Sequence, residues 1–500
     1  MDFHIGIDCG SQGTKTVIVN EDGKVVGRGY NRYDLIEGLP PGHREQHPST
    51  WIQAVNKTVR EAFTEASIRS LDIKSIGISG QQHGFVPLDI TGNVIRAVKL
   101  WNDTSTTEEC NRIINTLGGV KKVVSLVGNT ILPGFTAGKI LWMKIHEPNN
   151  YSRLNMVLLP HDYINYWLTG KITMEAGDAS GTALMDIRTR RWSKEVIDTI
   201  DPLLIEKLPN IHPSYEPAGF VTKEAARQLG LTENILVSSG GGDNMMGAIG
   251  TGNTKNGIVT LSLGTSGTIY SYSKVPLVDP FGEVHAFCDS TGAWLPLVCT
   301  MNVTVATELV RTLFKLSHKD LESIIGSSSP GSDGLIMLPY LTGERTPNIP
   351  NGKGVLYGLS PQTFTAQNIA RSVMEGVTLG LNYGLNKLKE IGVELTEVRI
   401  TGGGAKNRAW RQIVADVFDS EVVCLKVDEG AAYGAAIQAL WAYRLSLGEK
   451  VNISDITDEF VKLDNKTRMK PNPSNTDTYR KLQTFQNKLS QTLLDTFNFT

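Results

Sequence analysis

Residues 5–15 read IGIDCGSQGTK, an alternating apolar stretch that ends in one aspartate and runs at once into glycine and hydroxyl residues. The β-branched stretch TVIV at 16–19 follows, and NEDG at 20–23 supplies the residues of a turn. The pattern predicts a β-hairpin with a tight, glycine-rich connection. Backbone N–H groups can approach a phosphate closely where no Cβ intervenes, so this connection is a candidate phosphate-binding loop.

The same pattern returns in the second half of the chain. Residues 257–273 read GIVTLSLGTSGTIYSYS, in which an apolar strand again runs into a glycine–hydroxyl turn and a β-branched strand. This repeat indicates an internal duplication with one loop in each half. A single loop of this kind is more often only a hairpin connection, whereas two loops together favour a clamp around a polyphosphate. We therefore expect two domains, 1–245 and 246–500.

Three later segments complete the organisation of the chain. Residues 398–418, VRITGGGAKNRAWRQIVADVF, lead from a strand into an amphipathic helix, and residues 429–444 are rich in small residues, as in a helix suited to close packing. The polar stretch 466–478 is expected to be a surface connection to a last helix at 479–496.

Composition narrows the class of protein. The chain has 500 residues and a net charge of −2, so nothing in its charge points to nucleic acid or to an anionic membrane as a partner. Its opening residues lack the features of a secretory signal, and no apolar stretch is long enough to cross a bilayer. The five cysteines include no C-x-x-C pair, which is typical of reduced thiols. These features predict a cytoplasmic protein.

Common nucleotide-binding motifs are absent. A Walker A loop needs G-x-x-x-x-G-K-[ST], and Lys15 follows its glycine at the wrong spacing. The glycines at 247–252 do not form G-x-G-x-x-G, and neither H-R-D nor D-F-G occurs. A P-loop enzyme, a Rossmann dinucleotide site and a protein kinase are therefore all unsupported.

Two aspartates accompany the glycine runs. Asp8 precedes the first loop, and Asp243 lies in GGGDN, a stretch too rich in glycine to be explained by packing. A carboxylate at a phosphate site is repelled unless a divalent cation screens it or it accepts the proton of an attacking hydroxyl. Each residue taken alone also fits an ordinary turn. For a base in a loose transition state, an ordinary carboxylate pKa is expected to suffice.

Several stretches resemble a known superfamily. DCGSQGTK (8–15), SLGTSGT (262–268) and TGGGAKN (401–407) resemble the first phosphate, second phosphate and adenosine motifs of the actin, hexokinase and Hsp70 superfamily. GFTAGKILW (134–142) and the segment from 354 to 375 are similar to the two signatures of the FGGY carbohydrate kinases. The resemblance implies two α/β domains of the actin-like ATPase (ribonuclease H-like) type, each with a mixed five-stranded sheet, and an active site in the interdomain cleft.

Within this family, six stretches are most similar to the members that phosphorylate xylulose: SGQQHG (79–84), LWND (100–103), PHDY (160–163), VHAFC (284–288), LPYLTGERTP (338–347) and GGGAKNRAWRQ (402–412). The resemblance implies ATP-dependent, Mg²⁺-assisted phosphorylation of D-xylulose to D-xylulose 5-phosphate. Many of those members have Met in place of Gln82 and an Arg soon after the W-N-D triplet, where this chain has TST at 104–106. L-ribulose, L-xylulose, gluconate and glycerol therefore stay open as substrates, as does a homodimer. A rival of another class is an actin-like or Hsp70-like ATPase that drives binding to a partner.

The resemblance also implies roles for individual residues. Asp243 would be the general base for the primary hydroxyl of the sugar, and Asp8, together with Asp243, would lie at the Mg²⁺. His83 taken alone would fit a structural role equally well. The sugar contacts implied are Gln82, His83, Asp103 and Asn244. The phosphate loops implied are Ser11, Gln12, Gly13, Thr14 and Lys15 on one side and Gly264, Thr265 and Ser266 on the other, with Gly403, Gly404 and Asn407 contacting adenosine.

Overall fold

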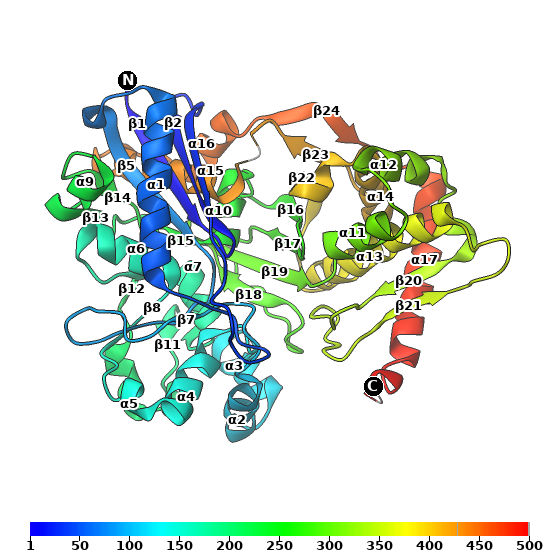
Figure 1. Ribbon diagram of the computed structural model, residues 1–500, viewed down its shortest axis with the longest axis horizontal. Helices are drawn as coiled ribbons and strands as arrows, with labels where there is room; N and C mark the ends of the chain where they lie inside the picture. Colours follow the sequence, from blue (N-terminus) through cyan, green and yellow to red (C-terminus); the bar gives the residue numbers. More distant parts are fainter. Residues whose placement is uncertain (428, 499–500) are drawn as a thin grey trace. The chain divides into compact units, whose positions relative to one another are not determined.

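The computed structural model describes residues 1–427 and 429–498, which form two compact units (Figure 1). Each unit takes up three segments of the chain. The first unit consists of Met1–Lys255, Tyr272–Leu295 and Glu429–Val461, and the second of Asn256–Ser271, Pro296–Asp428 and Lys462–Thr500. The expected domains, 1–245 and 246–500, stay a prediction. The compact units are a different division of the chain, in which the first unit also includes two segments from the second half.

The first unit is built on one mixed sheet with the strand order β13-β14-β5-β1-β2-β3, and β15 also pairs with β5. The predicted hairpin is confirmed: β1 runs antiparallel to β2 and parallel to β5. In the described part of the chain this sheet has seven strands, so the expectation of five is wrong. The strands are β1 (Phe3–Cys9), β2 (Gly13–Asn20), β3 (Val25–Arg32), β5 (Ile73–Gly80), β13 (Gly219–Phe220), β14 (Leu236–Val237) and β15 (Gly241–Gly242).

Helices and short strands complete this unit. Helix α1 lies along one face of the sheet (Figure 1), where Thr58 Oγ1 lies 2.7 Å from Thr16 Oγ1 of β2. The helices used below are α1 (Pro48–Ala66), α2 (Thr107–Leu117), α4 (Thr136–His146), α6 (Pro160–Thr169), α7 (Ala176–Ala179), α10 (Asp243–Gly250), α15 (Gly430–Ser446) and α16 (Ile453–Phe460), and the short strands are β4 (Glu45–Gln46), β7 (Val98–Lys99) and β18 (His285–Cys288).

Glycines let helix α15 lie directly on the sheet and on α10. A Cβ added at Gly6 of β1 would lie 1.9 Å from the carbonyl oxygen of Ala432, and one at Gly77 of β5 would lie 2.0 Å from that of Ala435. A Cβ at Gly250 of α10 would lie 2.1 Å from the carbonyl oxygen of Gly430. The close packing expected of residues 429–444 is therefore confirmed, and it fixes the position of α10.

The second unit repeats the topology of the first around its own hairpin. Strand β16 is antiparallel to β17 and parallel to β22, as β1 is to β2 and β5. The predicted duplication is confirmed at this level. Its strands run in the order β19-β17-β16-β22-β23-β24. Its elements are β16 (Gly257–Leu263), β17 (Gly267–Ser271), β19 (Trp294–Thr300), β20 (Ile336–Pro339), β21 (Gly354–Tyr357), β22 (Leu395–Thr401), β23 (Val422–Leu425), β24 (Leu463–Met469), α11 (Thr304–Leu313), α12 (His318–Ser327), α13 (Ala366–Glu390), α14 (Arg408–Phe418) and α17 (Pro473–Thr492).

The C-terminal segment differs from its prediction. Residues 463–469 form strand β24, and the last helix begins at Pro473 instead of residue 479. The side chain of Asn472 accepts a hydrogen bond from the N–H of Ser474, and Pro473 takes the first helical position, where its missing N–H costs nothing. Within the described ranges, no helix combines the length and the apolar character that crossing a membrane requires.

Strand β1 also carries a buried histidine that predicts how stability depends on pH. Burial, with a smaller contribution from Lys74, lowers the pKa of His4 from 6.5 to about 3, and His4 Nδ1 lies 2.7 Å from Ser75 Oγ. Below pH 6.5 the unfolded chain takes up a proton at His4 that the folded chain does not, so stability falls as the pH drops toward 3. At about pH 5 we expect a loss of about 2 kcal/mol relative to neutral pH.

Thermal unfolding at several pH values tests this expectation. His4→Gln should lose part of the acid-induced fall in the midpoint, whereas His318→Gln, which changes an exposed side chain, should behave like the parent. An unchanged pH dependence in His4→Gln would contradict the role given to His4.

Candidate functional site

Asp8 lies near the end of β1, opposite Ser79 of β5. Ser79 Oγ donates a hydrogen bond to Asp8 Oδ1 at 2.8 Å. Burial raises the pKa of Asp8, and the Ser79 hydroxyl and the positive charge of Lys15 oppose that rise. The carboxylate is therefore held in a fixed direction at a strand end beside the first glycine turn.

The Tyr33 side chain stabilises the first glycine turn. The N–H of Gly10 donates to the carbonyl of Gly13 at 3.0 Å, and the Tyr33 hydroxyl donates to the carbonyl of Gly10 at 2.7 Å. Thr14 Oγ1 is buried and lies 3.2 Å from the same hydroxyl. The Thr14 side chain thus supports the loop, and phosphate contact from this part of the hairpin would come from other groups.

The remaining residues of the turn are more accessible. Gln12 is exposed, and Ser11 Oγ accepts a hydrogen bond from Trp101 Nε1 at 2.8 Å. Lys15 Nζ lies 3.2 Å from Glu429 Oε2, a carboxylate just before α15. The structure brings all five predicted loop residues to one hairpin, and their phosphate-binding role stays a prediction.

Asp243 is the first residue of helix α10, directly after the short strand β15. Burial, followed by the charges of Asp8 and Asp178, raises the pKa of Asp243 to about 7. The hydrogen bond from the N–H of Asn244 to the carboxylate opposes this rise. The expectation that an ordinary carboxylate pKa suffices for the base stays a prediction; the pKa of Asp243 itself is raised, because the carboxylate is buried and two acidic residues distant in sequence share its low-dielectric surroundings. A pKa near neutral suits a group that both accepts and releases a proton.

Two of the four predicted sugar contacts, Gln82 and Asn244, are linked to this carboxylate by hydrogen bonds. Asn244 Nδ2 donates to Asp243 Oδ1 at 3.0 Å and to Gln82 Oε1 at 2.7 Å. Gln82 Nε2 is buried and has no hydrogen-bond partner among the residues described. Gln82 and His83 come shortly after β5, which ends at Gly80, so one strand end and one helix start bring the amides of Gln82 and Asn244 to the Asp243 carboxylate.

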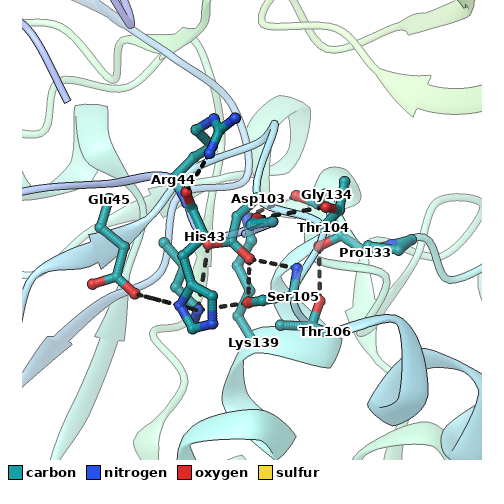
Figure 2. A network of polar contacts seen from close by, with 12 residues as sticks. His43, Arg44, Glu45, Asp103, Thr104, Ser105, Thr106, Pro133, Gly134 and Lys139 are labelled. Carbon is teal, nitrogen blue, oxygen red and sulfur yellow. Dashed lines mark hydrogen bonds and ion pairs between the residues drawn. The ribbon is translucent and has the colours of Figure 1, made fainter. Parts of the chain in front are cut away.

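Asp103, the fourth predicted contact, lies in an ionic cluster with Lys99 and Ser105, next to Lys139 (Figure 2). It is fully buried, and its carboxylate accepts hydrogen bonds from the backbone N–H of Arg44 and from Ser105. Lys99 Nζ lies 3.3 Å from Asp103 Oδ2, 3.1 Å from His43 Nδ1 and 3.2 Å from Glu45 Oε1. His43, Glu45 and Asp103 have the atoms of a metal site, but an ammonium group already lies among them. Sugar contact by Asp103 stays a prediction that this arrangement does not favour.

A second buried network is not predicted by the sequence analysis, although two of its members, His161 and Asp162, lie in PHDY (160–163). His161 of α6 places Nε2 2.9 Å from Asp162 Oδ1 and Nδ1 2.9 Å from Asp178 Oδ2. Burial alone lowers the pKa of His161, but these two carboxylates hold it well above its usual value. Asp178 also acts on Asp243, so this network sets part of the electrostatics of the candidate site.

The second glycine turn lies in the other unit, between β16 and β17. The N–H of Gly264 donates to the carbonyl of Ser266 at 3.1 Å, as Gly10 does to Gly13 in the first hairpin. The carbonyls of Gly264 and Thr265 accept hydrogen bonds from Thr304 and Val303, where α11 begins. The three predicted residues form one turn that is fixed to the start of a helix.

The three predicted adenosine contacts line one cavity of the second unit, whose volume is about 1200 Å³. Gly403 and Gly404 lie in the turn after β22, and the Asn407 side chain accepts a hydrogen bond from the N–H of Trp410 and so caps α14. A Cβ on Gly403 would meet nothing within 4 Å, whereas one on Gly404 would press on Leu263 and Trp410. Gly404 thus has a packing role, and Gly403 faces open space.

Comparison with known proteins gives a consistent result. The chain matches the model of the FGGY family of carbohydrate kinases, N-terminal domain, over residues 3–250, and that of its C-terminal domain over residues 259–443. It is 41% identical to a xylulose kinase from Haemophilus influenzae over 485 residues, which cover 96% of this chain and 97% of that protein.

Two solved structures are similar over nearly the whole chain. A xylulose kinase from Rhodospirillum rubrum has 25% identity and a TM-score of 0.89, with 99% of this chain and 100% of that chain covered. A gluconate kinase from Lactobacillus acidophilus has 25% identity and a TM-score of 0.92, with both chains covered completely. The predicted fold class, two α/β domains of the actin-like ATPase type, is confirmed.

Proposed function

Because the chain belongs to the FGGY family of carbohydrate kinases, we propose that it transfers the γ-phosphoryl group of ATP to the terminal hydroxyl of D-xylulose, giving D-xylulose 5-phosphate and ADP. The choice of sugar is supported by the xylulose kinases among its relatives, one of which is similar over nearly the full length of both proteins.

One observation carries the mechanism: Asn244 links Asp243 to Gln82. A hydroxyl held by the Gln82 side chain and its neighbours would lie beside a carboxylate that can accept its proton. Burial raises the pKa of Asp243, so its carboxylate binds a proton more firmly than an ordinary aspartate does. Asp243 is therefore our candidate general base.

Mg²⁺ fits the donors present at this site. Burial raises the pKa of Asp243, and the charge of its acidic neighbour Asp8 raises it further. A divalent cation relieves such repulsion between carboxylates. When bound with ATP, Mg²⁺ supplies charge neutralisation at the phosphates. Asp8, oriented by Ser79, would hold it, and Asp243 would lie close by.

The nucleotide would be held by the second unit. Its cavity has room for an adenosine, and Gly403 leaves space at the wall. The two glycine turns supply backbone N–H groups for the phosphates. The proposal requires the nucleotide bound by the second unit to present its γ-phosphate to the sugar bound by the first.

Gly403→Val tests the nucleotide site separately from the sugar site. A Cβ at this position of the cavity lining meets no protein atom within 4 Å, so we expect the added side chain to compete with the nucleotide: KM for ATP should rise about tenfold or more while KM for the sugar stays within about twofold. Gly403→Ala should give a smaller change in the same direction. Equal KM values for ATP in all three proteins would place the nucleotide elsewhere.

Release of ADP from Mg-ATP tests the function itself. Separate reactions would contain D-xylulose, L-xylulose, D-ribulose, L-ribulose, D-gluconate, glycerol or no sugar. We expect D-xylulose to give the highest kcat/KM. Preference for D-gluconate, the sugar acid in the name of one structural neighbour, would retain the kinase mechanism and reject only the sugar.

A cytoplasmic location and a homodimer complete the proposal. The location is supported by the five cysteines, which are in the thiol form. The homodimer stays a prediction, which light scattering of the purified protein would test.

A further inference from the structure

The backbone of His83 has an unusual conformation at the candidate sugar site. Its φ is +65°, in the left-handed region that residues with a side chain rarely adopt. His83 follows Gln82, whose amide hydrogen-bonds Asn244. Such a conformation persists only where the surroundings enforce it, so the groups that hold this peptide also direct the two side chains.

Two donors from the start of helix α4 hold the carbonyl of His83. Lys139 Nζ donates to it at 2.6 Å, and Thr136 Oγ1 donates at 3.1 Å. Lys139 Nζ also donates to the carbonyl of Gly134 at 2.7 Å. Two converging donors fix the direction of a carbonyl more tightly than one, and one of them carries a charge.

The same helix start also holds the imidazole ring of His83. The ring lies 4.7 Å from that of Phe135, the residue just before α4, and 5.6 Å from that of Phe287. On another side, a Cβ added to Gly181 would lie 2.1 Å from the ring. Residues 135–139 therefore supply most of the contacts that fix both the backbone and the side chain of His83.

The ammonium of Lys139 is costly to keep at this place. Lys139 is fully buried, and burial lowers its pKa to about 7, although the Asp103 carboxylate opposes that shift. Its two hydrogen-bonding partners are carbonyls, and Figure 2 shows it next to the Asp103 cluster. A buried apolar side chain would fill this space at lower cost, which points to the contacts with the His83 and Gly134 carbonyls as the reason for a lysine.

We propose that Lys139 is a positioning residue for sugar recognition, which holds the His83 peptide so that His83 and Gln82 present their polar groups to the substrate. It acts through His83 and does not touch the reacting atoms. This inference rests on the proposed function, because it assigns the same site a determinant of its sugar preference.

Lys139→Met tests the proposal, since methionine keeps much of the length and removes the charge. A charge-assisted hydrogen bond is worth about a tenfold to hundredfold change in an equilibrium, and this change passes to sugar binding where binding requires the His83 peptide to be held in place. We expect KM and the calorimetric Kd for the preferred sugar to rise by about that factor, and the ratio of kcat/KM between the preferred and the next sugar to fall. KM for ATP should stay within about twofold.

Lys144→Met is the matched control. Lys144 lies on the same helix and its Nζ also donates to a carbonyl, that of Ile200, at 2.7 Å, away from His83. It should lose stability without any change in sugar preference. Thr136→Val removes only the second donor to His83 and should give a smaller change in the same direction, which keeps the test decisive if Lys139→Met does not fold.

The outcomes separate this inference from the function on which it rests. A parent enzyme that phosphorylates no sugar would reject both. If the parent enzyme has a clear sugar preference, and a folded Lys139→Met or Thr136→Val variant keeps the same KM for the sugar and the same preference, the positioning role alone is rejected. Equal increases in KM for sugar and ATP would also reject it, because a general loss of structure explains them.

Discussion

Asp243→Asn is expected to lower kcat by about 10²–10⁴, the usual contribution of a general base, with smaller effects on KM for ATP. The amide has nearly the shape of the carboxylate and can still accept the hydrogen bond from Asn244, but it cannot take a proton. Binding groups such as Gln82 remain in place, so the defect should appear in the chemical step.

The structure offers a matched control for this substitution. Asp455 is a carboxylate at the start of helix α16 in the same unit, where it forms a capping box with Asn452. Asp455→Asn should lower thermal stability slightly and leave kcat unchanged. An Asp243→Asn enzyme with parental kcat and a raised KM for sugar would assign Asp243 to binding and remove it as the base.

Gly434→Ala is expected to have the largest effect on stability. A Cβ at this position in α15 would lie 1.8 Å from the carbonyl oxygen of Met246 in α10, a backbone atom that cannot turn away. Overpacking of this kind costs about 1–3 kcal/mol and occasionally more, and we expect the upper end or beyond. Because Asp243 begins α10, any protein that folds by shifting this helix should also lose activity.

Thermal unfolding of Gly434→Ala and Gly380→Ala measures this effect. Gly380 lies inside helix α13, and a Cβ there would meet nothing within 4 Å. Gly380→Ala should therefore gain about 0.5–1 kcal/mol from the better helix propensity of alanine. A Gly434→Ala protein with the parental midpoint would show that the two helices are not packed as closely as described.

The parts of the fold that were predicted correctly depend on local patterns. The hairpins at 3–20 and 257–271 follow from alternating β-branched residues around a glycine turn, a signal contained within about twenty residues. The start of the last helix at Pro473 could also have been predicted, because Asn472 is a good N-cap residue and Pro473 suits the first helical turn. The prediction of residue 479 overlooked this local signal.

The features that sequence did not reveal depend on residues far apart in the chain. The pKa of Asp243 depends on Asp8 and Asp178, and no local pattern brings these three carboxylates together. Asp103 is the last residue of the LWND stretch, and its contacts with Lys99 and the Arg44 backbone come from tertiary structure that the stretch does not reveal. The path of the chain, which returns to the first unit at Tyr272 and at Glu429, is likewise set by packing between distant segments.

The most direct test of the central claim is the ratio of ADP to sugar phosphate formed in one reaction with Mg-ATP and D-xylulose. Enzymatic assay of ADP and ³¹P NMR of the sugar phosphate would give both amounts from the same sample. The account predicts one D-xylulose 5-phosphate for each ADP and little ADP without sugar. ADP formed at the same rate with and without D-xylulose, and no sugar phosphate, would contradict it and favour an ATPase that drives binding to a partner.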